Sequence, residues 1–401
     1  MTESQRTGIM DIAVYGGSFN PPHLGHREAV LTALERLDPD LLMIMPDHAP
    51  PHKQMEAGSP SPAERLALCR LTFGDLEKTE ISTLEIERMG KSYTYDTVQE
   101  LEEQYPGAKL TLVLGTDMLL SFEEWYHFEY LMEHCRLAVL AREEEDEAAL
   151  EETAERFRSS YGAEILILRH EPLPMSSTEI REMLRRRTGA EYLHPDAYAY
   201  VIRRRLYEAA PELSWLREQA YAMLDERRIA HVAGCEGEAI ELARKWGEDP
   251  ENAAEAGILH DITKRLSHEE QLKLCEKYDI ICDSAELRTP KLLHAKTGAA
   301  LARDLFGVPD AIYEAIRWHT TGKPDMTLLE KIIYIADYIE PTRDFPGVER
   351  LRELAYEDLD RSVLLGLQMT TEEIRRQGEE PYIDTLDACC WYEERISERR
   401  D

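Results

Sequence analysis

The 401-residue chain has none of the sequence features of a membrane-spanning, secreted or disulfide-stabilised protein. It contains no run that approaches the ~18 to 20 apolar residues needed to cross a membrane. Residues 1–11 lack the basic and then apolar layout of a secretory signal. The seven cysteines are odd in number and include no Cys-x-x-Cys pair, so neither a disulfide framework nor a zinc ribbon is indicated. We therefore expect a cytoplasmic protein with no membrane partner.

Positive charge is also scarce, because 47 lysines and arginines face 79 aspartates and glutamates, for a net charge of −32. A surface this acidic repels nucleic-acid backbones, so we expect no DNA or RNA partner. Small anionic ligands can still bind where cationic groups gather locally. One such cluster consists of Arg181, Arg185, Arg186 and Arg187. The sequence leaves the oligomeric state open.

The chain is long enough for two or three domains, and its pattern changes once. Up to about residue 170, short apolar runs alternate with amphipathic segments, which predicts a Rossmann-like, doubly wound parallel α/β sheet. The expected strands span residues 12–15, 41–45, 81–86, 110–114, 137–141 and 165–168, and the expected helices 25–37, 62–73, 94–104 and 146–161. From residue 212 onward the period is helical and predicts an all-α bundle, with helices over 213–227, 230–247, 251–260, 268–277, 292–306, 309–318 and 328–340. We place the boundary near Ala209-Ala210-Pro211, which gives domains 1–208 and 209–401.

The most informative segment is GGSFNPPHLGH, at residues 16–26, between an apolar strand and a helix. Gly16 and Gly17 let the backbone approach a ligand closely, and the free N–H groups of a helix start attract phosphate. His23 and His26 are three residues apart and lie on one face of that helix start. The segment predicts a nucleotide-phosphate site with cationic side chains of its own.

Other polar groups in the first half also follow strands or begin helices. Ser176 and Glu179 fit a capping box, so a helix starts there with exposed N–H donors, and Arg181 can reach a triphosphate. Lys53 follows the second strand, where it either meets a phosphate or belongs to a polar turn. Trp125 either stacks on a flat aromatic ring or packs in the core.

Taken in order, the motifs GGSFNPPHLGH, PPHK, SYTYDT, LGTD, WY and SSTEIR resemble the bacterial nicotinate mononucleotide adenylyltransferases of the HxGH nucleotidyltransferase superfamily, over roughly residues 10–205. The resemblance implies transfer of AMP from ATP to nicotinate mononucleotide, giving deamido-NAD and pyrophosphate, with Mg²⁺ on the ATP. It implies ATP contacts from Gly16, Gly17, Ser18, Phe19, His23, His26, Gly115, Asp117, Ser176, Ser177, Thr178 and Arg181, and mononucleotide contacts from Asn20, Thr94, Tyr95 and Trp125. The residues that would stabilise charge on the phosphates, without a covalent enzyme intermediate, are His23, His26, Lys53 and Arg181. Phosphopantetheine adenylyltransferases and cytidylyltransferases share the fold, but SYTYDT and Trp125 favour a nicotinate ring. The sequence leaves open whether the acceptor is the acid or the amide, nicotinamide mononucleotide.

The second half carries histidines and aspartates on separate predicted helices, at His231, His260, Asp261, His294, His319 and Asp337. Each histidine taken alone is more often a helix cap or a core residue. Together they offer the imidazole and carboxylate donors that a dinuclear metal site inside a helical bundle needs.

The order His…His-Asp…His…His…Asp, with its surrounding strings, resembles the HD-domain metallophosphohydrolases, and within them the symmetrical diadenosine-tetraphosphate hydrolases (the YqeK family), over about residues 212–390. The resemblance implies hydrolysis of diadenosine tetraphosphate to two ADP at two divalent metals, with iron expected and manganese as the alternative. It assigns one ion to His231, His260, Asp261 and Asp337, and the other to Asp261, His294 and His319. Lys264 and Arg343 would contact phosphate, unless they are solvated surface charges. A rival interpretation makes this half a nucleotide-sensing module or a general nucleotide phosphohydrolase.

Overall fold

The computed structural model describes residues 9–51, 55–142, 147–170, 173–283, 286–288 and 290–399. Its contacts divide the chain into two compact units, Met1–Ala210 and Pro211–Asp401. Among the described residues, no helix combines the length and the apolar character needed to cross a membrane.

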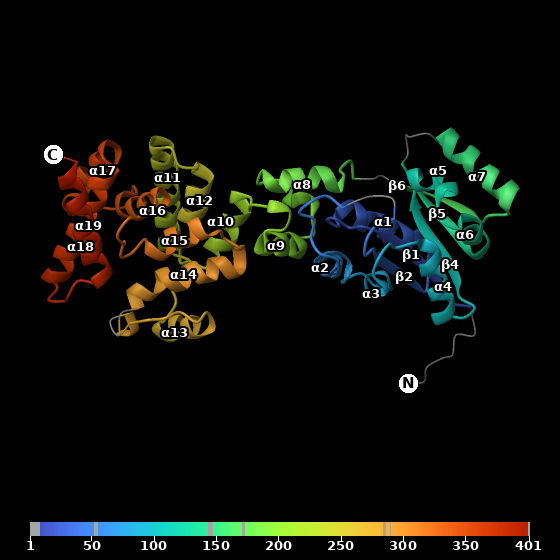
Figure 1. Ribbon diagram of the computed structural model, residues 1–401, viewed down its shortest axis with the longest axis horizontal. Coiled ribbons are helices and arrows are strands. Elements are labelled where there is room, and N and C mark those ends of the chain that lie inside the picture. Colours follow the sequence, from blue (N-terminus) through green and yellow to red (C-terminus); the bar gives the residue numbers. More distant parts are fainter. Residues whose placement is uncertain are drawn as a thin grey trace. The chain divides into compact units, whose positions relative to one another are not determined.

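The first unit is built on a six-stranded parallel sheet with the order β3-β2-β1-β4-β5-β6 (Figure 1). The strands are β1 (Asp11–Gly17), β2 (Leu41–Pro46), β3 (Thr79–Ile81), β4 (Lys109–Gly115), β5 (Cys135–Arg142) and β6 (Ile165–His170). The direction of winding reverses between β1 and β4. The carboxyl ends of these two strands therefore frame the position where open α/β sheets bind their ligands.

Helices cover both faces of this sheet, because alternate strand residues point to opposite sides. Ala13 and Leu42 belong to one core, with α1 and α2, while Ile12 and Met43 belong to the other, with α4, α6 and α7. The helices of the unit are α1 (Leu24–Leu37), α2 (Pro62–Phe73), α3 (Leu84–Arg88), α4 (Thr94–Gln104), α5 (Thr116–Leu120), α6 (Phe128–His134), α7 (Glu147–Tyr161), α8 (Ser177–Arg185) and α9 (Pro195–Arg204). The doubly wound, Rossmann-like fold expected from the sequence is confirmed.

The strand predicted over residues 81–86 is wrong. β3 ends at Ile81, and helix α3 (Leu84–Arg88) follows almost at once. The Ser82 hydroxyl accepts a hydrogen bond from the backbone N–H of Leu84 at 3.2 Å. This local bond from a short polar side chain starts a helical turn, where the apolar spacing alone favoured a strand.

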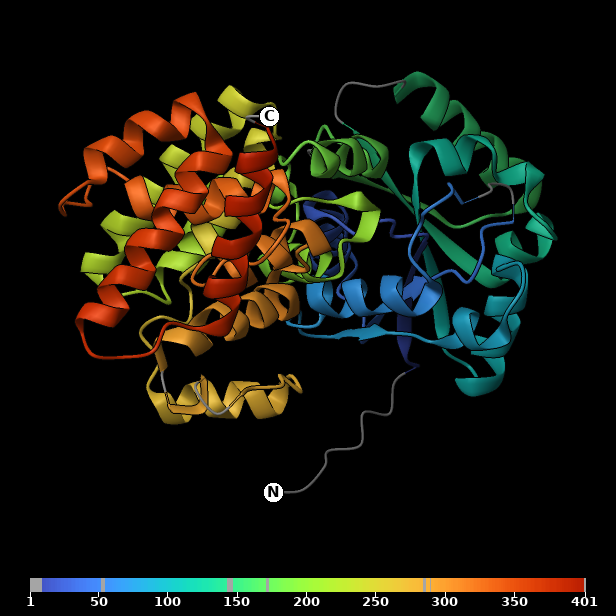
Figure 2. The ribbon, with the colours of Figure 1, turned by 60° about the vertical axis from the view of Figure 1, so that its left-hand side comes forward.

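The second unit consists of helices, with no strand in the part of it that the structure describes (Figure 2). They are α10 (Leu213–Tyr221), α11 (Glu226–Trp246), α12 (Pro250–Leu259), α13 (His268–Lys277), α14 (Pro290–Phe306), α15 (Asp310–Trp318), α16 (Leu328–Ile339), α17 (Val348–Glu357), α18 (Leu359–Arg376) and α19 (Ile383–Glu398). The apolar helix α16 packs against α11, α12, α15 and α18, and its buried side chains form much of the core. The expected all-α bundle is confirmed.

One helix boundary in this unit differs from the prediction over 213–227. The helix ends at Tyr221, and α11 begins at Glu226. The carboxylate of Asp225 accepts a hydrogen bond from the backbone N–H of Arg228 at 2.9 Å, so it caps the new helix.

Candidate functional sites

A cavity of about 560 Å³ lies at the carboxyl ends of β1 and β4. The residues suggested for ATP all line it: Gly16, Gly17, Ser18, Phe19, His23, His26, Gly115, Asp117, Ser176, Ser177, Thr178 and Arg181. Asn20, which the resemblance placed with the mononucleotide, lines this cavity too. Lys53 lies outside the described residues. The starts of α1 and α8 bring free backbone N–H groups to the same wall, which suits a bound phosphate.

His23 and His26 lie at the start of α1, with their ring centroids 3.7 Å apart. Nδ1 of His26 accepts a hydrogen bond from the backbone N–H of His23 at 3.2 Å, which assigns the ring proton to Nε2. Burial lowers the pKa of His23 to about 4. Burial and the neighbouring His23 together hold the pKa of His26 well below its usual value. Both imidazoles are therefore neutral near pH 7, so His26 offers a hydrogen-bond donor where the sequence suggested a cation.

The loop after β1 is held in place by Arg65 of α2, which the sequence did not single out. The Arg65 side chain is only 1% exposed, and it donates to the Ser18 carbonyl at 2.6 Å and to Asp47 Oδ1 at 3.0 Å. The Ser18 hydroxyl donates to Asp47 Oδ2 at 2.6 Å. An arginine in an amphipathic helix looks like a surface charge in sequence, so only its burial reveals this role. Asp47 directly follows β2, and this position at the carboxyl end of a strand could have indicated from the sequence that Asp47 lies near the site.

Arg181 of α8 is buried against the same loop. It donates to the Asn20 carbonyl at 2.7 Å and forms an ion pair with Glu56 Oε1 at 2.6 Å. The Ser177 hydroxyl donates to the Pro21 carbonyl at 3.0 Å. These bonds tie the start of α8 to the loop after β1, so the two phosphate-facing segments form one wall.

A second cavity, of about 310 Å³, shares residues 16–18 with the first. Thr94, at the start of α4, lines it together with the rings of Trp125 and Tyr126. Tyr95, which was predicted beside Thr94, is not among the described residues that line it. Its ring packs edge-on against Tyr126, with centroids 5.7 Å apart. The second cavity can therefore hold a flat ring next to whatever occupies the first.

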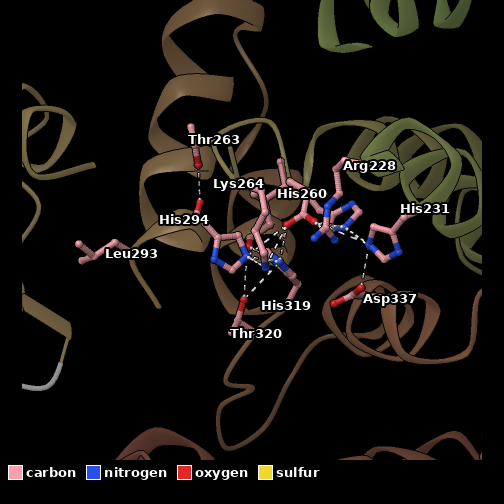
Figure 3. Close-up of polar contacts among 12 residues, drawn as sticks. Arg228, His231, His260, Thr263, Lys264, Leu293, His294, His319, Thr320 and Asp337 are labelled. Atoms are coloured by element: carbon pink, nitrogen blue, oxygen red, sulfur yellow. Dashed lines mark hydrogen bonds and ion pairs between the residues drawn. The ribbon is translucent and has the colours of Figure 1, made fainter. Parts of the chain in front are cut away.

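In the second unit, the six predicted ligand side chains converge from separate segments of the bundle. Figure 3 labels His231, His260, His294, His319 and Asp337 among them. Asp261 lies at their centre. Its Oδ2 lies 3.7 Å from His231 Nε2 and 3.6 Å from His260 Nε2. Its Oδ1 lies 3.2 Å from His294 Nε2 and 3.6 Å from His319 Nε2. One carboxylate thus faces two different pairs of imidazoles, as a group that bridges two ions must.

The hydrogen bonds of His260 and His319 leave their inward Nε2 atoms without a proton. Nδ1 of His260 and Nδ1 of His319 donate to carbonyls three residues earlier, at 2.8 and 2.6 Å. Nδ1 of His231 donates to the Glu340 carboxylate at 3.0 Å, a partner that the sequence did not suggest although it follows Asp337 by three residues. Nε2 of His231 lies 3.2 Å from Nε2 of His260 and 3.1 Å from Asp337 Oδ1. Burial acts to lower the pKa of His231, but its hydrogen bonds with Asp337 and Glu340 raise it, so a metal ion bound here would displace a proton. The donor set fits divalent metal ions, and its ligand atoms gather within 4.8 Å in two groups: His231, His260 and Asp337, and His260, Asp261 and His319.

The protonation states of His260, His294 and Asp261 also suit metal binding. Burial lowers the pKa of His260 and the pKa of His294 to about 4. Burial acts to raise the pKa of Asp261, but the neighbouring His260 and the contacts with His294 and His319 hold that pKa well below its usual range. Neutral imidazoles and an ionised carboxylate are the forms that bind a metal ion.

Three cationic side chains contact the ligand carboxylates. Lys264 Nζ lies 3.6 Å from Asp261 Oδ1, and Arg228 Nη1 donates to Asp261 Oδ2 at 3.0 Å. Arg343 forms an ion pair with Asp337. Lys264 and Arg343, which were predicted to contact phosphate, therefore lie beside the metal ligands. Arg228 was not singled out, although it precedes the first ligand by three residues on the same helix.

Comparisons with known proteins divide the chain in the same manner. A family model described as "Cytidylyltransferase-like" matches residues 14–183, and one described as "HD domain" matches residues 228–342. The symmetrical bis(5'-nucleosyl)-tetraphosphatase of Bacillus subtilis is 39% identical over 180 residues, which cover 44% of this chain and 96% of that protein. A probable nicotinate-nucleotide adenylyltransferase of Synechococcus sp. is 35% identical over 197 residues, which cover 49% of this chain and 96% of that protein.

A solved structure also matches part of the chain. It is a crystal structure of a "predicted HD superfamily hydrolase involved in NAD metabolism" from Clostridium acetobutylicum, with a TM-score of 0.45 and 35% identity. The match covers 47% of this chain and 100% of that one.

Gly25→Ala should destabilise the first unit, because the added Cβ would lie 3.1 Å from the His23 ring and from Leu173 Cβ. We expect the free energy of unfolding to fall by ~1–3 kcal/mol, as for other overpacked sites. Thermal or urea unfolding measures the change. In the control Gly237→Ala, nothing lies within 4 Å of the new Cβ, and stability should be kept or raised. Equal stability of Gly25→Ala and the wild type would contradict this packing.

Asp261→Asn should remove metal from the second unit, since it neutralises the one carboxylate that faces both imidazole pairs. Elemental analysis of the purified protein should show less bound divalent metal than in the wild type. Added Mn²⁺ should raise the melting temperature of the wild type but not of the variant, because a ligand that binds only the folded state stabilises it. Asp344→Asn, at an exposed position, is the matched control and should behave as the wild type. Undiminished metal content in Asp261→Asn would refute the assignment.

Proposed function

The first half of the chain belongs to the nicotinate-nucleotide adenylyltransferase family and the second half to the HD-domain symmetrical bis(5'-nucleosyl)-tetraphosphatases, and we propose that this one polypeptide carries both activities. The first half would transfer AMP from ATP to nicotinate mononucleotide. The second half would hydrolyse diadenosine tetraphosphate to two ADP. Both substrates are adenine nucleotides with polyphosphate chains, so both halves must handle concentrated negative charge.

The observation that supports the first activity best is the wall shared by the two cavities. Residues 16–18 line both, so ATP in the larger cavity and a mononucleotide in the smaller would meet there. The rings of Trp125 and Tyr126 offer apolar faces for a nicotinate ring, and the first N–H groups of α4, at Thr94, suit its carboxylate.

The transfer itself needs charge stabilisation more than proton transfer. The phosphate of the mononucleotide is already ionised near pH 7, so one of its oxygens attacks the α-phosphorus of ATP while the bond to the β-phosphate breaks and pyrophosphate leaves. The Nε2–H of His26, the N–H groups at the start of α1 and the guanidinium of Arg181 would stabilise the growing charge. Mg²⁺ bound to ATP would neutralise part of the triphosphate charge.

For the second activity, the supporting observation is the position of Asp261 between two pairs of imidazoles. One ion would be held by His231, His260, Asp261 and Asp337, and the other by Asp261, His294 and His319, with iron proposed and manganese as the alternative. Bound metals would polarise the phosphoryl oxygens and supply an activated water. The chain itself fixes the ligand nitrogens through the hydrogen bonds at their outer Nδ1 atoms.

We expect pyrophosphate release only when the full chain receives both ATP and nicotinate mononucleotide. Greater release with nicotinamide mononucleotide or phosphopantetheine would contradict the proposed acceptor. His26→Ala should lower kcat by about 10²- to 10³-fold, as for the loss of one oxyanion donor, while the protein still folds. His134→Ala is the control, because His134 pairs with Glu102 away from both cavities. Wild-type rates in His26→Ala would contradict the proposed role of His26 in stabilising the phosphate charge.

Chelation should separate the two activities. After treatment with a chelator and return to Mg²⁺ alone, ADP formation from diadenosine tetraphosphate should be lost while pyrophosphate formation from ATP persists. Iron or manganese should restore ADP formation in the wild type but not in His319→Ala. Nucleotide binding with no ADP release under any metal would instead support a sensing module.

A further inference from the structure

Arg228 and Lys264 each contact a different oxygen of the Asp261 carboxylate. Arg228 Nη1 donates to Oδ2 at 3.0 Å, and Lys264 Nζ lies 3.6 Å from Oδ1 and 2.9 Å from His294 Nε2. Since Oδ2 faces His231 and Oδ1 faces His294, each cation belongs to a different half of the donor set.

Both side chains extend from the buried ligands toward the surface. Their side chains are 30% and 31% exposed, whereas the Asp261 side chain between them is 2% exposed. Arg228 precedes the ligand His231 by three residues, and Lys264 follows Asp261 by three, so each cation lies about one turn from a ligand. The adjacent Arg227 and Arg265 are exposed and provide natural comparisons.

Two cations on one carboxylate are more than its charge requires. When Asp261 coordinates metal ions, their charge offsets that of the carboxylate, so its attraction for Arg228 and Lys264 weakens. Repulsion from a metal ion would then favour contact between each cation and an anionic substrate. Arg228 and Lys264 are placed to contact phosphates on opposite sides of the metal ligands.

We propose that Arg228 and Lys264 each bind one outer phosphate of a dinucleoside polyphosphate, and that this pairing selects the central linkage for cleavage. The inference rests on the proposed hydrolase function. Hydrolysis adds one water across the central P–O–P bridge: a bond forms from the water oxygen to phosphorus, the bridging P–O bond breaks, and two ADP trianions and two protons result. Central cleavage leaves one further phosphate on each side for the two cations. Off-centre cleavage to AMP and ATP leaves one cation with no such phosphate.

The chain-length dependence of hydrolysis tests this pairing in the full-length protein. Diadenosine tetraphosphate can contact both cations, whereas diadenosine triphosphate can contact only one. Arg228→Gln and Lys264→Gln should each lower kcat/KM for the tetraphosphate about 10- to 100-fold, as expected for a lost charge-assisted hydrogen bond. The triphosphate should lose less, and AMP with ATP should appear among the tetraphosphate products. Arg228→Lys should recover part of the loss, while Arg227→Gln and Arg265→Gln should match the wild type.

Three results would overturn the inference. Equal losses on both substrates would show that Arg228 only positions Asp261, and so would a loss of bound metal from Arg228→Gln by elemental analysis. Unchanged kinetics and products in Arg228→Gln would exclude any role for it.

Equilibrium binding of ADP separates this inference from the hydrolase proposal. A wild-type chain that releases no ADP from diadenosine tetraphosphate would refute the hydrolase function alone. Arg228→Gln should still bind ADP about tenfold more weakly than Arg227→Gln, by the same loss of a charge-assisted bond. Any ADP bound by the first unit contributes equally to both variants. Equal affinities would reject the role of Arg228.

Discussion

A net charge of −32 obliges this protein to create positive potential locally before it can hold a polyanionic nucleotide. The first unit does so mainly with neutral groups, because helix starts and the Nε2–H of His26 line its larger cavity. The second unit uses ionised groups, since the carboxylates of Asp261 and Asp337 pair with Arg228, Lys264 and Arg343. The imidazoles of His260 and His319 direct unprotonated Nε2 atoms toward the same site.

Histidine takes opposite roles in the two units, and one hydrogen bond decides which. Nδ1 of His26 accepts from a backbone N–H, so Nε2 keeps the proton and becomes a donor. Nδ1 of His260 and of His319 donates to a carbonyl three residues earlier, so the lone pair of Nε2 is available to a metal ion. Burial keeps the pKa of His23 and the pKa of His260 at about 4, which preserves these neutral forms near pH 7.

The fold was predictable where the apolar periodicity agrees with the residues that start or end helices. The predicted helix over 62–73 matches α2 because a serine cap and a proline mark its start. The prediction over 81–86 failed because the Ser82 hydroxyl redirects the backbone, a local bond that periodicity does not register. In the first site, the sequence motifs identified the residues that line the cavity, but the sequence did not identify Arg65. A buried arginine that supports a loop from another helix has the same sequence pattern as a solvated one.

The lack of a side chain at Gly16 matters for the ligands rather than for the packing of the protein. A Cβ there would meet only the Met45 carbonyl oxygen, at 3.9 Å, so the packing of the chain has room for a larger residue. Yet Gly16 borders both cavities. A methyl group at Gly16 would therefore extend into the space between the two cavities without straining the packing of the chain. It would separate the phosphate oxygen of a mononucleotide in one cavity from the α-phosphorus of ATP in the other.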